Sequence, residues 1–166
     1  YFGGNDLNYY VEDIYVGYRY FETVAKDKVK YPFGYGLSYG GKAGYGPLKA
    51  EKRSDGIRLS FSLTNDDTEY SMTETAQIYV SAPGAGIDSP FSSLAGFKRV
   101  KLAPGETKKV SMAVSKELMK TVMEDGSSVL VPGKYIFSAA AAAVSGTATR
   151  MMSQPAAARR SMSAKE

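Results

Sequence analysis

The sequence predicts an all-β fold, an antiparallel β-sandwich of about seven strands that is preceded by an irregular, aromatic-rich connector. Three observations support this prediction. Apolar and polar residues alternate in short runs across the middle of the chain, turn-forming residues separate these runs, and no helix-length pattern lies between most of them. Short strands joined by turns indicate two antiparallel sheets rather than one parallel sheet.

The clearest strand covers residues 57–64. Its odd-numbered residues are apolar and its even-numbered residues are polar, which places one face in a core and the other in water. Asn65-Asp66-Asp67 then ends the strand as a turn, because Asn and Asp side chains hydrogen-bond to the nearby backbone. Similar alternation and turn signals predict further strands near residues 48–52, 76–80, 97–102, 110–114 and 129–131, and around 135–137.

One short helical segment is expected among the strands. Leu118, Met119 and Val122 are spaced as on one face of a helix within residues 116–123, and Ser115 precedes them as a candidate N-cap. We therefore expect one or two helical turns at this place.

The strand-rich part holds about 95 residues, which suits one immunoglobulin-like domain. The chain of 166 residues contains no Cys and no Trp. It therefore lacks the Cys…Trp…Cys pattern of antibody domains, and the sequence favours a fibronectin type III-like relative.

The N-terminal part is of a different composition, since residues 1–46 contain 10 of the 13 Tyr and 9 of the 17 Gly. Residues 9–21 are rich in aromatic and β-branched residues, so strand propensity predicts an extended segment. Residues 31–39 cannot be helical, because Pro32 fixes its own φ and favours an extended residue before it. The glycine-rich residues 40–46 are expected to be flexible. Packing against a neighbouring domain is a stronger expectation for the tyrosines than contact with a sugar ring.

Composition excludes several classes of function. Without Cys and His, the chain has no thiolate or imidazole ligand for zinc and no cysteine or histidine catalyst. The formal net charge is +4, and residues 150–166 carry most of it, so no basic face for nucleic acid is expected. No apolar run approaches the ~18–20 residues that cross a bilayer, and no leader precedes the first residues, so we expect a soluble chain without a membrane partner. The compartment stays open between cytoplasmic, periplasmic and secreted.

Carboxylates occur in three adjacent pairs, Glu12-Asp13, Asp66-Asp67 and Glu124-Asp125. Neighbours in a strand point to opposite faces, so such a pair rarely converges on one substrate atom, and the last two pairs read as turns. Arg19 is expected to make a cation–π contact or an ion pair with Glu12 or Glu22. The sequence therefore predicts no catalytic, cofactor-binding or metal-binding residue.

Two stretches at the N-terminal side carry a family resemblance. YVEDIYVGYRYF at residues 10–21 and YPFGYGLSY at residues 31–39 resemble the segment with which glycoside hydrolase family 3 enzymes leave an α/β-sandwich domain and enter a fibronectin type III-like domain. The resemblance covers roughly residues 5–138. It continues, in the order of the family, through QIYVS at 77–81, LAGFKRV at 94–100, LAPGET at 102–107 and PGKY at 132–135.

The resemblance implies a division of the chain into three parts. Residues 1–46 would be the tail of an α/β domain and an interdomain connector, residues 47–143 the fibronectin type III-like sandwich, and residues 144–166 a low-complexity basic tail or linker. The residues expected to pack between domains are Tyr18, Arg19, Tyr20, Tyr31, Pro32, Phe33, Gly34, Tyr35, Gly36, Leu37 and Tyr39.

Family 3 enzymes, among them β-glucosidases and β-xylosidases, are retaining glycosidases that use a carboxylate nucleophile and a carboxyl acid/base. In the family these groups lie on a barrel and on the α/β domain, and nothing in this sequence matches either motif. The resemblance implies a non-catalytic module, inactive alone, whose partners are the catalytic domains of a β-glycosidase, with a β-glucoside or oligosaccharide at the edge of their cleft. Two alternatives remain: an independent carbohydrate-binding or adhesion module, and a subunit of a split or circularly permuted β-glucosidase.

Overall fold

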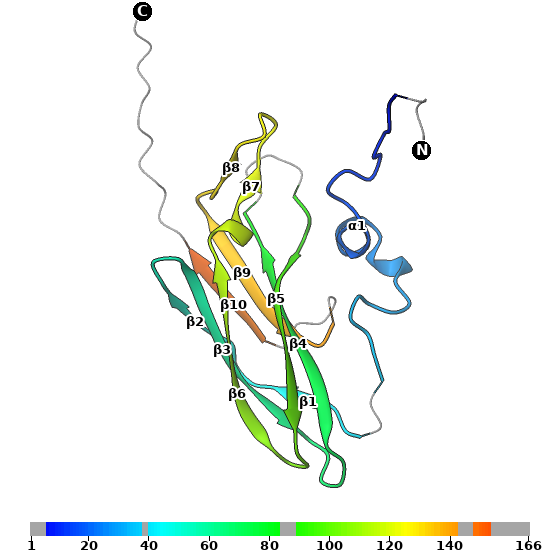
Figure 1. The fold of residues 1–166 in the computed structure, drawn as a ribbon, viewed down its shortest axis with the longest axis vertical. Helices are drawn as coiled ribbons and strands as arrows, with labels where there is room; N and C mark the ends of the chain where they lie inside the picture. Colours follow the sequence, from blue (N-terminus) through cyan, green and yellow to red (C-terminus); the bar gives the residue numbers. More distant parts are fainter. Residues whose placement is uncertain (1–5, 38–39, 84–88, 143–147, 154–166) are drawn as a thin grey trace, which may run out of the picture.

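The structure, a computed structural model, describes residues 6–37, 40–83, 89–142 and, by backbone alone, 148–153. It confirms the predicted all-β sandwich (Figure 1). Its elements are α1 (Tyr18–Val24), the 3₁₀ helix η1 (Lys26–Lys28), β1 (Ala43–Tyr45), β2 (Lys49–Lys52), β3 (Gly56–Asn65), β4 (Met72–Ser81), β5 (Ser93–Leu102), β6 (Thr107–Ser115), the 3₁₀ helix η2 (Glu117–Met119), β7 (Thr121–Val122), β8 (Ser128–Val129), β9 (Lys134–Ala140) and β10 (Ala148–Ser153).

The strands form two four-stranded antiparallel sheets and one small hairpin. In the first sheet β3 pairs with β6 on one side and with β2 and β1 on the other. In the second sheet the order is β10-β9-β4-β5. The strands β7 and β8 pair only with each other among the described residues. Each long strand is therefore next to a partner that runs in the opposite direction, as short turns require.

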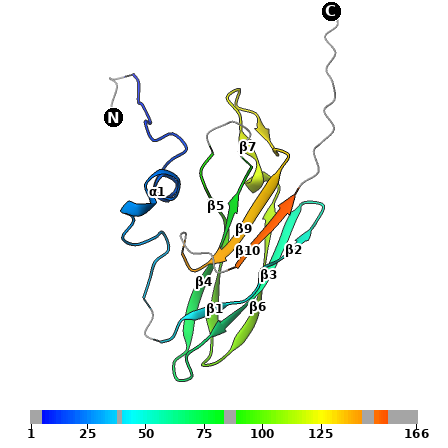
Figure 2. The same cartoon turned by 180° about the vertical axis from the view of Figure 1, so that it is seen from behind.

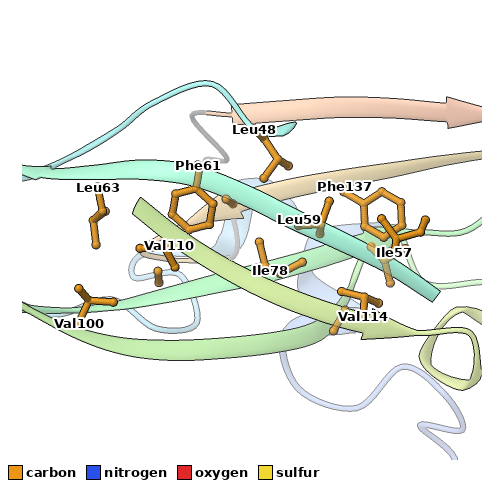
Figure 3. Packing of buried hydrophobic residues seen from close by; sticks show 14 of the residues in the cluster. Leu48, Ile57, Leu59, Phe61, Leu63, Ile78, Val100, Val110, Val114 and Phe137 are labelled. Atoms are coloured by element: carbon orange, nitrogen blue, oxygen red, sulfur yellow. The ribbon is translucent and has the colours of Figure 1, made fainter. Parts of the chain in front are cut away.

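The core lies between the two sheets. Figure 3 shows Leu59 and Phe61 of β3 packed with Ile78 of β4 and Phe137 of β9. Leu59, Ile78 and Phe137 are fully buried. Burial of one such side chain contributes about 1.5–3 kcal/mol relative to leaving it exposed. The apolar residues that alternate in the sequence therefore stabilise the packing of the two sheets.

The predicted turn after β3 is present and is built around a buried amide. The Nδ2 of Asn65 donates to the carbonyl oxygens of Tyr70 (2.8 Å) and Ala103 (3.1 Å). The carboxylate of Asp67 accepts from the backbone N–H of Tyr70 and of Glu69, and these bonds hold the pKa of Asp67 below its ordinary value. Asn65 thus ties two loops at one end of the sandwich.

The strand β5 lies at one edge of the second sheet, because among the strands that the structure describes it pairs with β4 alone. Lys98, Arg99 and Lys101 are exposed along it. The β4–β5 register shifts between Ile78 and Tyr79, which is a local bulge.

Residues 6–37, called the connector below, lie beside the second sheet. Both views place the connector next to β4 and β5 and away from β2 and β3 (Figures 1 and 2). The outward positions of β4 are therefore partly covered by the connector.

The prediction of an extended segment at residues 9–21 was wrong. Residues 11–14 form a turn and residues 18–21 begin α1. The helix begins after Gly17, whose φ is 61°, and it turns Tyr18 and Glu22, one helical turn apart, toward the sheet. Contacts with the sheet therefore outweigh the strand propensity of the aromatic residues.

Three local expectations also differ from the structure. The segment 40–46 was expected to be flexible but contains β1, which pairs with β3. The helical turns expected at 116–123 shorten to η2 and continue as β7, and Ser115 is the last residue of β6 rather than an N-cap. The strand β10, which extends the second sheet beyond β9, was not predicted.

Candidate functional site

Tyr18 fixes the helix of the connector to the sandwich. Its ring stacks on Phe33 with centroids 4.9 Å apart and meets Tyr79 of β4 edge to face at 6.0 Å. Its hydroxyl oxygen accepts a hydrogen bond of 2.7 Å from the backbone N–H of Leu94 on β5. One side chain therefore bonds the connector to both strands at this side of the second sheet.

A second contact lies at Gly34. This glycine has φ of 85° and sits against the side-chain amide of Gln77. The Gln77 Nε2 donates to the carbonyl oxygen of Ala141 (2.6 Å), and its Oε1 accepts from the hydroxyl of Tyr79 (2.5 Å). Burial raises the pKa of Tyr79, and the neighbouring Tyr18 and Glu22 raise it further.

A third contact involves Thr23 at the end of α1. The Thr23 Oγ1 accepts from the backbone N–H of Phe91 (2.9 Å) and donates to the carbonyl oxygen of Arg19 (2.7 Å). The ammonium group of Lys26 lies 5.9 Å from the centroid of the Phe91 ring, which is a cation–π distance. The connector is therefore held at three separate places.

The residues expected to pack between domains differ in their surroundings. Tyr18, Phe33 and Gly34 contact the sandwich or the residues that do so. Tyr31 and Leu37 point into solvent, with 70% and 88% of their surfaces exposed. Tyr20, Tyr35 and Gly36 are exposed as well, Arg19 and Pro32 are half-buried, and Tyr39 lies outside the described residues.

Arg19 does not make the contacts expected of it. Among the described residues it forms no ion pair with Glu12 or Glu22 within 4.0 Å and no cation–π contact. It lines a cleft of about 290 Å³ between the connector and the loops that follow β4 and β6. Glu22 is buried, whereas Glu12 lines a separate groove.

That groove is a feature that sequence reasoning missed. It has a volume of about 510 Å³ and is lined by connector residues alone, namely Val11, Glu12, Tyr15, Gly17, Tyr20 and Phe21. The stretch reads as aromatic and β-branched throughout, and only the turn at residues 11–14 and the start of α1 reveal which side chains share a face. The arrangement offers apolar walls and one carboxylate.

The acidic residues of the described part of the chain do not gather at one place. No group of three or more Asp, Glu, His or Cys residues within it could hold a metal ion. Asp67 and Asp125 accept bonds from the backbone of their own turns, as the sequence indicated for these pairs. In the same part of the chain, no helix is long and apolar enough to cross a membrane.

The two sheets and the strand order define an immunoglobulin-like sandwich, and the fibronectin type III-like domain family matches residues 74–143. A β-glucosidase of Ruminococcus albus is 36% identical over 128 residues, which is 75% of this chain and 13% of that protein. The structure of a β-glucosidase from Kluyveromyces marxianus in complex with glucose superimposes with a TM-score of 0.81 at 31% identity, covering 87% of this chain and 18% of that one. The structure of β-glucosidase 3B from Thermotoga neapolitana in complex with glucose superimposes with a TM-score of 0.80 at 30% identity, covering 87% of this chain and 20% of that one.

The chain is therefore a fibronectin type III-like module with an N-terminal connector. It is homologous to the C-terminal region of glycoside hydrolase family 3 β-glucosidases. It spans about one eighth to one fifth of the length of these relatives.

Proposed function

We propose that this chain is the non-catalytic structural module of a family 3-like β-glycosidase, and that it stabilises and positions the catalytic domains. The parent reaction would be hydrolysis of terminal, non-reducing β-D-glucosyl residues, in line with the names of the relatives. In this proposal residues 1–46 connect to an α/β domain, residues 47–143 form most of the sandwich, and residues 144–166 are a tail or linker. The two outer parts each add a strand to the sandwich, namely β1 and β10.

The observation that carries the proposal is the two-sided connector. One side is held on the sandwich: Tyr18 is hydrogen-bonded to β5, Thr23 is hydrogen-bonded to Phe91 in the loop before β5, and Gly34 lies against β4. The other side leaves large apolar side chains in solvent, among them Tyr31 and Leu37. Exposed apolar patches of this kind mark surfaces where proteins meet, so the connector supports a role in joining domains.

The partners in this proposal are the catalytic domains, with a β-glucoside or oligosaccharide at the edge of their cleft. An independent carbohydrate-binding module would need aromatic rings that lie in one plane. The rings of Tyr31 and Tyr35 are 4.9 Å apart but are inclined by 47° to each other, which favours packing over a flat sugar platform.

A segment exchange in the Ruminococcus albus β-glucosidase tests the proposal. One variant lacks the segment homologous to this chain, a second carries this chain in its place, and the unmodified enzyme is the control. We expect the deletion to lose most of its activity toward an aryl β-glucoside and to melt at a lower temperature, and the exchange to restore both. A deletion variant as active and as heat-stable as the unmodified enzyme would contradict the proposed role.

The isolated chain supplies the second test. We expect it to hydrolyse no aryl β-glucoside and to give no heat signal with cello-oligosaccharides in isothermal titration. Millimolar or tighter binding would favour the carbohydrate-binding alternative, and hydrolysis by material free of other glycosidases would refute a non-catalytic role.

A further inference from the structure

The groove of the connector is lined by connector residues, and no described side chain of the sandwich is in its lining. Its walls are apolar, since Val11, Tyr15, Tyr20 and Phe21 supply most of them. Val11 has 76% of its surface exposed. Covering these walls with an apolar group is favourable, because burial of apolar surface contributes roughly 25 cal/mol per Å².

We propose that this groove receives one apolar side chain, flanked by a basic residue, from the catalytic part of the β-glycosidase. The inference rests on the proposed function and adds to it the place of contact and the chemistry of the group that docks there.

The groove is formed in advance of binding. The rings of Tyr20 and Phe21 meet edge to face with centroids 5.4 Å apart, which sets one wall. The helix that carries these rings contacts β4 and is hydrogen-bonded to β5 through Tyr18, and Thr23 bonds it to Phe91 in the loop before β5. Gly17 also lines the groove, and a β-carbon at this position would meet nothing within 4 Å. A rigid, open groove binds with a smaller loss of conformational entropy than a mobile one.

The negative charge of Glu12 favours a basic residue next to the apolar side chain that docks in the groove. Glu12 lines the groove and forms no ion pair with any described residue. A carboxylate beside apolar walls is stabilised by a cation that donates hydrogen bonds to it, so a Lys or Arg of the partner fits best.

A protein surface is the occupant that the remaining observations favour. The homologous segments belong to polypeptides about five to eight times longer than the part that this chain covers. The outer face of β3, in the other sheet, is polar, because its outward residues Ser60, Ser62 and Thr64 alternate with buried apolar residues. The connector, by contrast, offers exposed apolar side chains such as Val11, Tyr20 and Phe21 to a large neighbour.

The exchange variant of the Ruminococcus albus enzyme described above tests the groove. We expect the double substitution Val11→Ser/Phe21→Ser to lower its melting temperature by about 2 °C or more. Glu12→Lys is expected to lower it as well, and by more than Glu12→Gln, because it adds repulsion. Tyr70→Ser is the matched control, since Tyr70 is an exposed aromatic residue near the turn between β3 and β4, outside the groove. It is expected to change the melting temperature by less than about 1 °C.

The outcomes separate this inference from the proposed function. If deletion of the segment destabilises the enzyme but the groove substitutions behave like Tyr70→Ser, the groove is not the docking site and the structural role stands. If deletion has no effect, the structural role fails, and the groove with it.

The isolated chain gives a measurement that does not depend on the exchange variant. An open apolar groove binds the dye 1-anilinonaphthalene-8-sulfonate, so we expect its fluorescence with the chain to fall at least twofold in Val11→Ser/Phe21→Ser and to be unchanged in Tyr70→Ser. The circular dichroism melting curve of the double variant should match that of the unmodified chain. Equal dye fluorescence in all three proteins would overturn the proposed groove.

Discussion

Gly34 of the connector lies against the side-chain amide of Gln77 on β4, in a space that no side chain can share. A β-carbon at position 34 would overlap the Gln77 Nε2 and stand 3.0 Å from the carbonyl oxygen of Ala141. The φ of Gly34 is 85°, a conformation that residues with a side chain rarely adopt. The close approach of the connector to β4 therefore depends on glycine at this position.

Gly34→Ala is expected to destabilise the chain by about 1–3 kcal/mol, because it adds both backbone strain and an overlap with Gln77. Gly36→Ala is the control, since Gly36 has no atom within 4 Å of its would-be β-carbon and no positive φ. Urea unfolding of the two variants measures the difference. Equal unfolding midpoints would show that the approach at Gly34 is not needed.

Tyr18→Phe removes the hydroxyl that accepts the bond from Leu94 and keeps the ring stack on Phe33. We expect a loss of about 1 kcal/mol and faster hydrogen exchange at the amide of Leu94. Tyr20→Phe removes the hydroxyl of an exposed tyrosine and is expected to change stability by less than about 0.5 kcal/mol. Hydrogen exchange at Leu94 that stays as slow as in the unmodified chain would contradict the contact.

Alkaline pH is expected to weaken the sandwich through Tyr45. The Tyr45 hydroxyl donates a hydrogen bond of 3.0 Å to Glu74 Oε1, and its ring stacks on Phe61. Burial, together with the negative charge of Glu74 and the hydrogen bond to it, raises the pKa of Tyr45 above its ordinary value. Because the pKa of Tyr45 is higher in the folded chain than in the unfolded chain, neutral Tyr45 contributes its full stability below the unfolded pKa of about 10. This contribution is lost as the pH rises from there toward the folded pKa.

Tyr45→Phe therefore provides a direct comparison. Urea midpoints of the variant and the unmodified chain should differ most at pH 7, and the difference should narrow above about pH 10, where the unmodified chain loses the tyrosine contribution. Burial also raises the pKa values of Tyr79 and Tyr135, but both tyrosines are present in the variant and in the unmodified chain, so their titration cancels in the difference. A difference that is constant from pH 7 to pH 11 would contradict this assignment.

Acid is expected to act through the turn at Asp67. The pKa of Asp67 is lowered by the backbone bonds from Tyr70 and Glu69, so its contribution to stability is present above its unfolded pKa and is lost as the pH falls through the lower, folded value. Asp67→Asn should be less stable than the unmodified chain at pH 7, and the two should converge below about pH 3. Thermal melts at the two pH values measure this, and a gap that persists in acid would rule out the carboxylate charge as its cause.

Sequence reasoning found the sandwich because its signal is local. Leu59 and Leu63 alternate with polar residues, and a side chain that alternates in the sequence alternates in space along a strand. The turn at Asn65 could be predicted for the same reason, since Asx residues bond to their own backbone. Strand order and the partner of β5 could not be read in this way, because pairing joins residues far apart in the sequence.

The connector shows where such reasoning fails. Tyr18 and Phe21 have strand propensity, yet they form a helix because Tyr18 gains contacts with Tyr79 and Leu94, about 60 and 76 positions away. The groove at Glu12 depends on that helix, so it could not be predicted from the sequence either. The strand β10 was missed because the Ala-rich end of β9 carries no alternation to mark a following strand.

The unpaired side of β5 has a consequence for copies of this molecule in solution. An open strand of ten residues would ordinarily recruit a second chain and begin a growing fibril. Lys98, Arg99 and Lys101 repel the same positions of an incoming copy, and the bulge near Ile78 bends the ladder out of line. We therefore expect these charges and the bulge to disfavour pairing of β5 with a second copy of the chain.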